Sequence, residues 1–88
     1  MKCKYLFEKM ELDGEIVAVP VGERADELHA VLNVNEEAMR ILELLQEETT
    51  EQEIVSKLMS EYEGNEEEIK PLVSGFIDQI RQEGLIEE

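Results

Sequence analysis

Few side chains in this sequence are of types that could carry out catalysis. His29 is the single histidine, so a histidine-rich metal site and a Ser-His-Asp triad both lack support. Cys3 is the single cysteine, and one thiolate with one imidazole is a poor set of zinc ligands. No Gly-rich phosphate-binding loop of either common pattern occurs. We therefore expect a non-catalytic protein that binds no cofactor and no metal.

Clustered carboxylates are the remaining chemical candidates. They lie at 47–48, at Glu51 and at 66–68. These clusters lack the alternating Asp, Asn and Gly of a calcium-binding loop, and most fall where helices are expected to begin. Acidic side chains at a helix start interact favourably with the helix dipole. We interpret the clusters as solvated helix ends.

The net charge argues against a nucleic-acid partner. The chain has 23 Asp and Glu residues against 8 Lys and Arg residues, a net charge of -15. Such a surface repels phosphates, whereas nucleic-acid binding draws on Lys and Arg side chains that displace counterions. A basic or mainly apolar partner is easier to accommodate.

Length, hydropathy and cysteine content predict the number of domains and the location of the protein in the cell. The 88 residues are expected to form one domain, 1–88. No stretch approaches the roughly 20 apolar residues that a membrane span requires, so no membrane association is expected. The lone cysteine cannot form an internal disulfide, and no long apolar run follows the N-terminal lysines. These features predict a cytoplasmic protein.

The first third of the chain has the pattern of a three-stranded antiparallel sheet. Residues 4–11 and 15–21 are expected to be strands, joined by a hairpin turn at the Asp-Gly pair 13–14. Pro20 cannot donate to a sheet, which places that end of its strand at an edge or beside a bulge. Leu28–Leu32 is expected to be the third strand.

Three amphipathic helices are expected to follow, which gives an α+β fold. Asn33 or Asn35 can cap the first, over about residues 36–47. Thr50 has a glutamate three residues later, the spacing of a capping box, and predicts the start of the second. The third helix either is kinked at Pro71 or starts near Lys70.

The third helix has an apolar arc that is wider than a minimal core stripe. At about 100° per residue the arc spans roughly 140°. Its members are Leu72, Val73, Phe76, Ile77 and Ile80. Core packing explains most of this arc. One flank, such as Val73 and Ile77, can instead line a groove beside the third strand, and the alternative flank is Leu72 and Phe76.

A strand edge next to an apolar helix is suited to binding an extended peptide. The edge supplies backbone hydrogen bonds, and the groove accepts alternate side chains. The same edge can pair with a second copy of the chain, and homodimerisation would then compete with peptide. Peptide binding is the function that this architecture favours.

The order of elements and several residues resemble the PqqD family. This family is the peptide-chaperone module of pyrroloquinoline quinone biosynthesis, and its fold also serves as the recognition element of many ribosomal peptide-modifying systems. The resemblance covers about residues 12–87. It is carried by Asp13-Gly14-Glu15, Ile16 to Val19, Val31-Leu32-Asn33, Ala38, Ile41-Leu42, Leu45, Thr50, Glu53-Ile54-Val55, Leu58, Phe76-Ile77 and Gly84-Leu85-Ile86.

This resemblance implies a winged-helix-like domain, with an N-terminal three-stranded sheet and a three-helix bundle. In it, the leader of a precursor peptide adds as a strand to the third strand and packs against the third helix. The residues at the corresponding positions are Leu28, His29, Ala30, Val31, Leu32, Val73, Phe76, Ile77 and Ile80. A second surface would meet a modifying enzyme, frequently a radical S-adenosylmethionine enzyme. The domain itself would bind no cofactor.

Two other functions remain open from the sequence. A winged-helix DNA-binding regulator would share the class of fold, but its second and third helices would be acidic and would lack phosphate contacts. An orphan regulator would bind a partner protein without any peptide modification. A radical enzyme and a short precursor gene beside this one would favour the leader-binding function.

Overall fold

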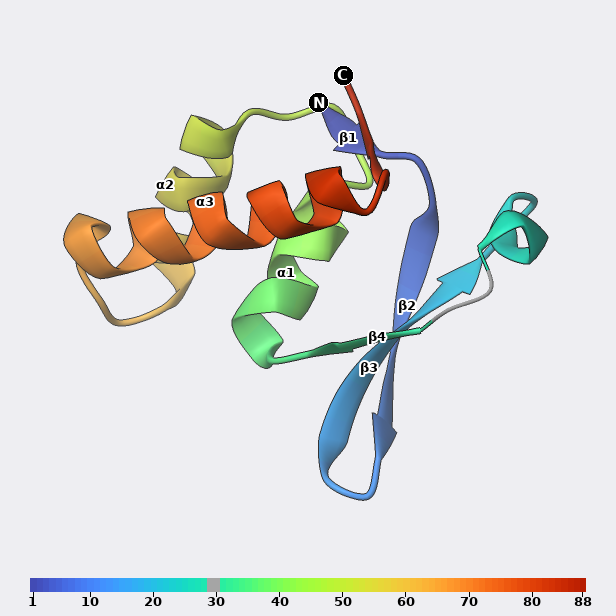
Figure 1. Cartoon of the computed structure of the whole chain (residues 1–88). Coiled ribbons are helices and arrows are strands. Elements are labelled where there is room, and N and C mark those ends of the chain that lie inside the picture. Colours follow the sequence, from blue (N-terminus) through green and yellow to red (C-terminus); the bar gives the residue numbers. More distant parts are fainter. Residues whose placement is uncertain (29–30) are drawn as a thin grey trace.

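The computed structural model describes residues 1–28 and 31–88, and its helices pack together at one side of an antiparallel sheet (Figure 1). The sheet comes first in the chain and the helices follow, so the predicted α+β fold is confirmed. The elements in order are β1 (Lys2–Cys3), β2 (Leu6–Leu12), β3 (Glu15–Val21), the 3-10 helix η1 (Ala25–Glu27), β4 (Leu32–Val34), α1 (Glu36–Leu44), α2 (Glu51–Glu61), α3 (Glu66–Gln82) and β5 (Ile86–Glu87).

β2 and β3 form the expected hairpin, which extends away from the helices (Figure 1). The two turn residues, Asp13 and Gly14, both have positive φ angles, of 52° and 79°. Two-residue hairpin turns need such angles to match the twist of the strands, and Asp-Gly adopts them readily. The first long strand starts at Leu6, two residues later than predicted.

The third strand also lies later in the chain than predicted. β4 starts at Leu32 rather than at Leu28. Leu28 instead follows η1, and its amide donates a hydrogen bond to the carbonyl of Ala25. Two other residues of the predicted strand, His29 and Ala30, lie outside the described residues. The apolar alternation of 28–32 therefore predicted the presence of a strand but placed it too early in the chain.

Pro20 has its backbone on the β4 side of β3. The pairs of β2 and β3 alternate between hydrogen-bonded and non-hydrogen-bonded, starting from the hydrogen-bonded pair Leu12 and Glu15 at the turn, so the backbone of Phe7 faces away from β3. Its carbonyl accepts a hydrogen bond from the side chain of Gln46 at 3.3 Å. Phe7 is opposite Pro20, and such a pair does not exchange hydrogen bonds. Pro20 thus faces the β4 side, where it has no N–H to donate. The described β3–β4 pairing covers residues 16–18 and stops short of Pro20.

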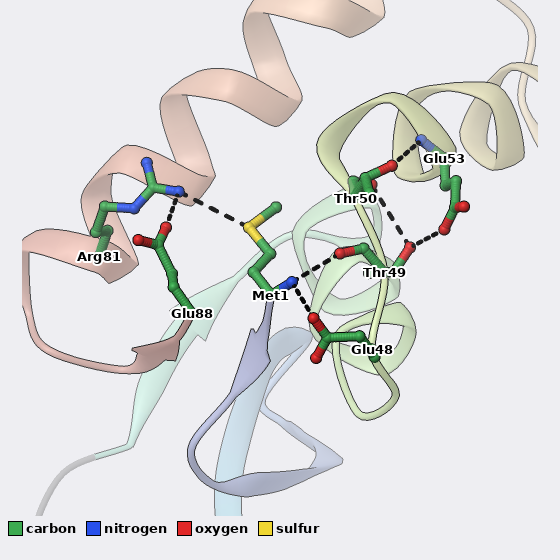
Figure 2. Close-up of polar contacts among 7 residues, drawn as sticks. All are labelled: Met1, Glu48, Thr49, Thr50, Glu53, Arg81 and Glu88. Carbon is green, nitrogen blue, oxygen red and sulfur yellow. Dashed lines mark hydrogen bonds and ion pairs between the residues drawn. The ribbon is translucent and has the colours of Figure 1, made fainter.

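A two-stranded sheet that the sequence did not predict, β1 with β5, joins the two ends of the chain. Polar contacts surround it (Figure 2). The Met1 amino group donates to the Glu48 carboxylate at 2.6 Å and to the Thr49 carbonyl at 2.9 Å. Arg81 forms an ion pair with Glu88 at 2.6 Å. The N-terminal segment, the α1–α2 connection and the end of α3 are thereby held together.

Side-chain caps start the helices. Asn35, and not Asn33, caps α1 by accepting a hydrogen bond from the amide of Ala38. α1 ends at residue 44, earlier than the predicted residue 47. Thr50 accepts a hydrogen bond from the amide of Glu53, as the capping box predicts.

α3 runs through Pro71 without a break. It starts at Glu66, which excludes a start near Lys70. Pro71 lies in the second turn, where its ring costs the helix one hydrogen bond, to the carbonyl of Glu67. The remaining turns of the helix compensate for this loss.

The core lies between the helices and the inner face of the sheet, where Phe7 and Ala18 are buried. None of the side chains buried in the described part of the chain is polar or charged. The largest fully buried side chains are Ile41, Leu42, Leu45, Ile54, Leu58, Val73, Ile77 and Ile80.

Candidate functional site

β4 is at an open edge of the three-stranded sheet. The backbone N–H and C=O groups of successive β3 residues point alternately toward β2 and toward β4. Those of Pro20 are on the β4 side, so those of Ile16 and Ala18 are as well, and they face Val34 and Leu32. The N–H and C=O of Asn33, between these two, must then point away from the sheet. A further strand can pair with this backbone donor and acceptor.

The apolar arc of α3 divides into a buried side and an exposed flank. Val73, Ile77 and Ile80 are at most 1% exposed. The expectation that Val73 and Ile77 line an open groove is therefore wrong, because these side chains lie in the core against the other helices. Leu72 is 39% exposed and Phe76 is half-buried. The outward flank is the alternative one, Leu72 with Phe76.

The Leu72 end of this flank faces the start of α1. Leu72 and Glu37 line a common hollow of about 160 Å³ at the start of α1. β4 leads directly into that start, and α1 contacts both β4 and α3 (Figure 1). On the opposite side of α3, Lys70 and Ser74 border a separate hollow that is shared with Glu51 of α2.

The predicted site residues have different environments. Leu28, Leu32 and Phe76 are partly buried and pack against the same core cluster. Val31 is 56% exposed. We use the name β4–α3 site for the edge and flank together, which comprise Leu28, Val31, Leu32, Asn33, Leu72 and Phe76.

Gly75 lies next to Leu72 on the exposed surface of α3, three residues further along the helix, and sequence reasoning did not single it out. A Cβ atom at Gly75 would meet no atom of the described residues within 4 Å. Glycine in a helix interior costs about 1 kcal/mol relative to alanine, and no contact in the described chain requires it here. The sequence does contain a signal for this position, namely a glycine inside a helix next to an apolar arc. A glycine has no side chain, so another backbone can approach the helix closely there.

The surroundings of the site are acidic. Glu37, Glu63 and Glu68 line the hollow beside Leu72. Tyr62 lines it as well, and burial raises the pKa of its hydroxyl, with a smaller contribution from nearby carboxylates. A ligand that combines apolar side chains with Lys or Arg would match this charge.

Metal ligands, the thiol and membrane-spanning helices can be checked in the described part of the chain. Residues 1–28 and 31–88 contain no group of three His, Cys, Asp or Glu side chains placed to hold a metal ion. Burial raises the pKa of the Cys3 thiol to about 11, so this thiol is protonated at neutral pH and is a poor nucleophile. No helix in the same residues is long and apolar enough to cross a membrane.

The fold and the site define a small α+β domain in which α1 contacts both the edge strand β4 and α3, the helix that carries the apolar flank. The family model for coenzyme PQQ synthesis protein D (PqqD) matches residues 15–86, and the chain belongs to this family. No curated protein matches the chain. The predicted membership of the PqqD family is confirmed.

A solved structure supports the fold. It is described as TbiB1 in complex with the TbiA(beta) leader peptide, and it matches with a TM-score of 0.68 and 21% sequence identity. The match covers 99% of this chain and 95% of the other. The arrangement of sheet and helices is therefore shared along almost the whole length of both chains.

Proposed function

We propose that this protein is a non-catalytic adaptor that binds the leader of a ribosomally made precursor peptide and presents it to a modifying enzyme. The observation that carries the proposal is an edge strand, β4, and an exposed apolar flank of α3, both in contact with α1, in a chain of the PqqD family. The leader peptide bound to TbiB1, which has the same fold, supports the proposal.

In this function the leader adds to the sheet as a strand along β4. The backbone of Asn33 pairs with it, and Val31, with an exposed side chain, extends the contact along the same edge. His29 and Ala30 precede Val31 in the chain, and we retain them as proposed contacts. Leu28 completes the strand-side set.

The flank of α3 selects the side chains of the leader. Leu72 and Phe76 would contact apolar leader residues directly. Val73, Ile77 and Ile80 do not contact the leader in this proposal, since they are buried, and they instead fix the position of the helix. The acidic surroundings favour a leader with Lys or Arg beside its apolar residues.

The test is a calorimetric titration with the leader segment of the precursor gene next to this one. The Leu72→Glu variant should bind at least about tenfold more weakly, because it places a charge on the apolar flank. Met59→Glu is the matched control, since Met59 is equally exposed at 39% but lies on α2. Equal affinities for wild type and Leu72→Glu, or no binding by the wild type, would contradict the proposal.

The modifying enzyme is part of the proposal, and the resemblance points to a radical S-adenosylmethionine enzyme. A gene for such an enzyme beside this one would support that choice. A neighbouring gene for a different peptide-modifying enzyme would replace the enzyme class but leave the adaptor function in place.

A further inference from the structure

The sheet face opposite the helices carries exposed apolar side chains. Leu6, Met10 and Leu12 alternate along β2 and share one face, with exposed fractions of 48%, 47% and 54%. The residues of β3 on the same face are three valines and Glu15, by the pairing of the two strands. We name the apolar part of this surface the outer face: Leu6, Met10, Leu12, Val17, Val19 and Val21.

Val17 shows that the outer face is separate from the core. It is only 7% exposed, yet it does not belong to the core cluster, whereas its neighbour Ala18 does. Met10 and Asn33 lie opposite Val17 on the two adjacent strands and flank it. Contiguous exposed apolar surface in a soluble domain marks a site of interaction.

The charges on this face indicate what kind of partner it fits. Glu8 lies between Leu6 and Met10 on the same face of β2, and Glu15 lies on the same face of β3. Lys9 points to the other face, because it is opposite the inward-facing Ala18. The ionisable groups of β2 and β3 on the outer side are thus acidic.

A second copy of this chain is a poor occupant. It would bring the same carboxylates and another net charge of -15 against this surface. Like charges in register across an interface oppose association. A surface that is apolar at its centre and flanked by Lys and Arg is complementary in both respects.

We propose that the outer face docks the modifying enzyme through an apolar patch of that enzyme flanked by basic residues. This inference rests on the proposed function and names the second surface which that function needs. The outer face turns away from the helices, whereas the β4–α3 site lies beside α3. The enzyme and the leader therefore bind different parts of the domain, which adjoin at Asn33: its backbone is at the β4 edge, and its side chain is on the outer face beside Val17.

The test uses the full chain and the purified peptide-modifying enzyme encoded beside it. Met10→Glu should weaken enzyme binding at least about tenfold, because it buries a charge in the contact. Met59→Glu again serves as the control, since it makes the same change on an exposed methionine of α2 and should bind within about twofold of wild type. Both variants should bind the leader peptide as wild type does.

A second pair of variants tests the charge of the outer face. Glu8→Lys should weaken enzyme binding more than Glu66→Lys, which makes the same change in net charge at the start of α3. Equal effects would show that only the overall charge matters, and would overturn docking at this face.

Two further outcomes would also overturn the inference. One is enzyme binding that Met10→Glu leaves unchanged, or that the wild type lacks. The other is a wild-type dimer in sedimentation that Met10→Glu dissociates, because the occupant would then be a second copy. Failure of the leader titration is a separate result, since it contradicts the proposed function and involves other residues.

Discussion

Leu72 and Val73 are adjacent in the sequence and have opposite environments. Val73 is fully buried, whereas Leu72 is 39% exposed. The helical periodicity predicted that both belong to one apolar arc. It could not predict which edge of the arc is covered, because that depends on where the other helices lie against α3.

The two sides of the arc should differ in their effect on stability. Ile77→Ala removes a buried side chain and should lower the free energy of unfolding by about 2–5 kcal/mol. Leu72→Ala should lower it by less than about 1 kcal/mol, since much of that side chain is already in water. Urea denaturation of both variants measures the difference, and similar losses would contradict the assignment of the exposed flank.

Cys3 should make stability depend on pH in the alkaline range. Burial raises the pKa of its thiol from the usual 9.0 to about 11. Between these values the unfolded chain loses the thiol proton while the folded chain keeps it, so the free energy of unfolding falls as pH rises. The loss is on the order of 2 kcal/mol.

The Cys3→Ala variant isolates this contribution. Urea midpoints should be measured from pH 8 to about pH 11. The stability gap between wild type and Cys3→Ala should shrink as the pH rises through this range. A gap that stays constant would show that the thiol ionises with equal ease in the folded and unfolded chains.

At the scale of elements, turns and helix caps could be predicted from the sequence, whereas pairings between distant strands could not. The turn at Asp13 and the cap at Thr50 depend on neighbouring residues, and the structure has both. The pairing of β1 with β5 joins strands of two residues from opposite ends of the chain, too short for any periodicity. The bounds of β4 depend on its pairing with β3, so apolar alternation alone misplaced them.

Gly75 links the stability of α3 to the candidate site. Gly75→Ala should raise the free energy of unfolding by about 1 kcal/mol, because alanine is the better helix former and the added Cβ meets no described atom. If the leader packs on this flank, the same change should weaken leader binding. Ser74→Ala, on the side of the helix away from Leu72, is the control and should leave binding unchanged. Unaltered binding by Gly75→Ala would remove Gly75 from the site.

At the scale of the whole molecule, the net charge of -15 sets conditions for both folding and binding. The described ion pairs of the protein are mostly exposed; Arg40 and Glu61, joined by two hydrogen bonds of 2.8 Å, are 30% and 28% exposed. Exposed pairs contribute little, so mutual repulsion among the remaining carboxylates is largely uncompensated.

Added salt should therefore stabilise the protein. Raising NaCl from about 0.02 to 0.2 M shortens the Debye length from beyond 20 Å to below 10 Å and screens this repulsion. The Tm should rise by about 4–8 °C for each kcal/mol of repulsion relieved. A variant with Glu47→Lys and Glu63→Lys should respond less in the same thermal scans. A Tm that falls with salt would show that attractive pairs dominate.

The most direct test of the central claim is an NMR titration of the labelled protein with the leader segment of the neighbouring precursor. If the leader adds to β4 and packs on the exposed flank of α3, amide shifts should concentrate in residues 31–34 and 72–76, and the Asn33 amide should gain protection from hydrogen exchange. Shifts confined to the β2–β3 hairpin or to α2, with the Asn33 amide unprotected, would contradict strand addition at this edge.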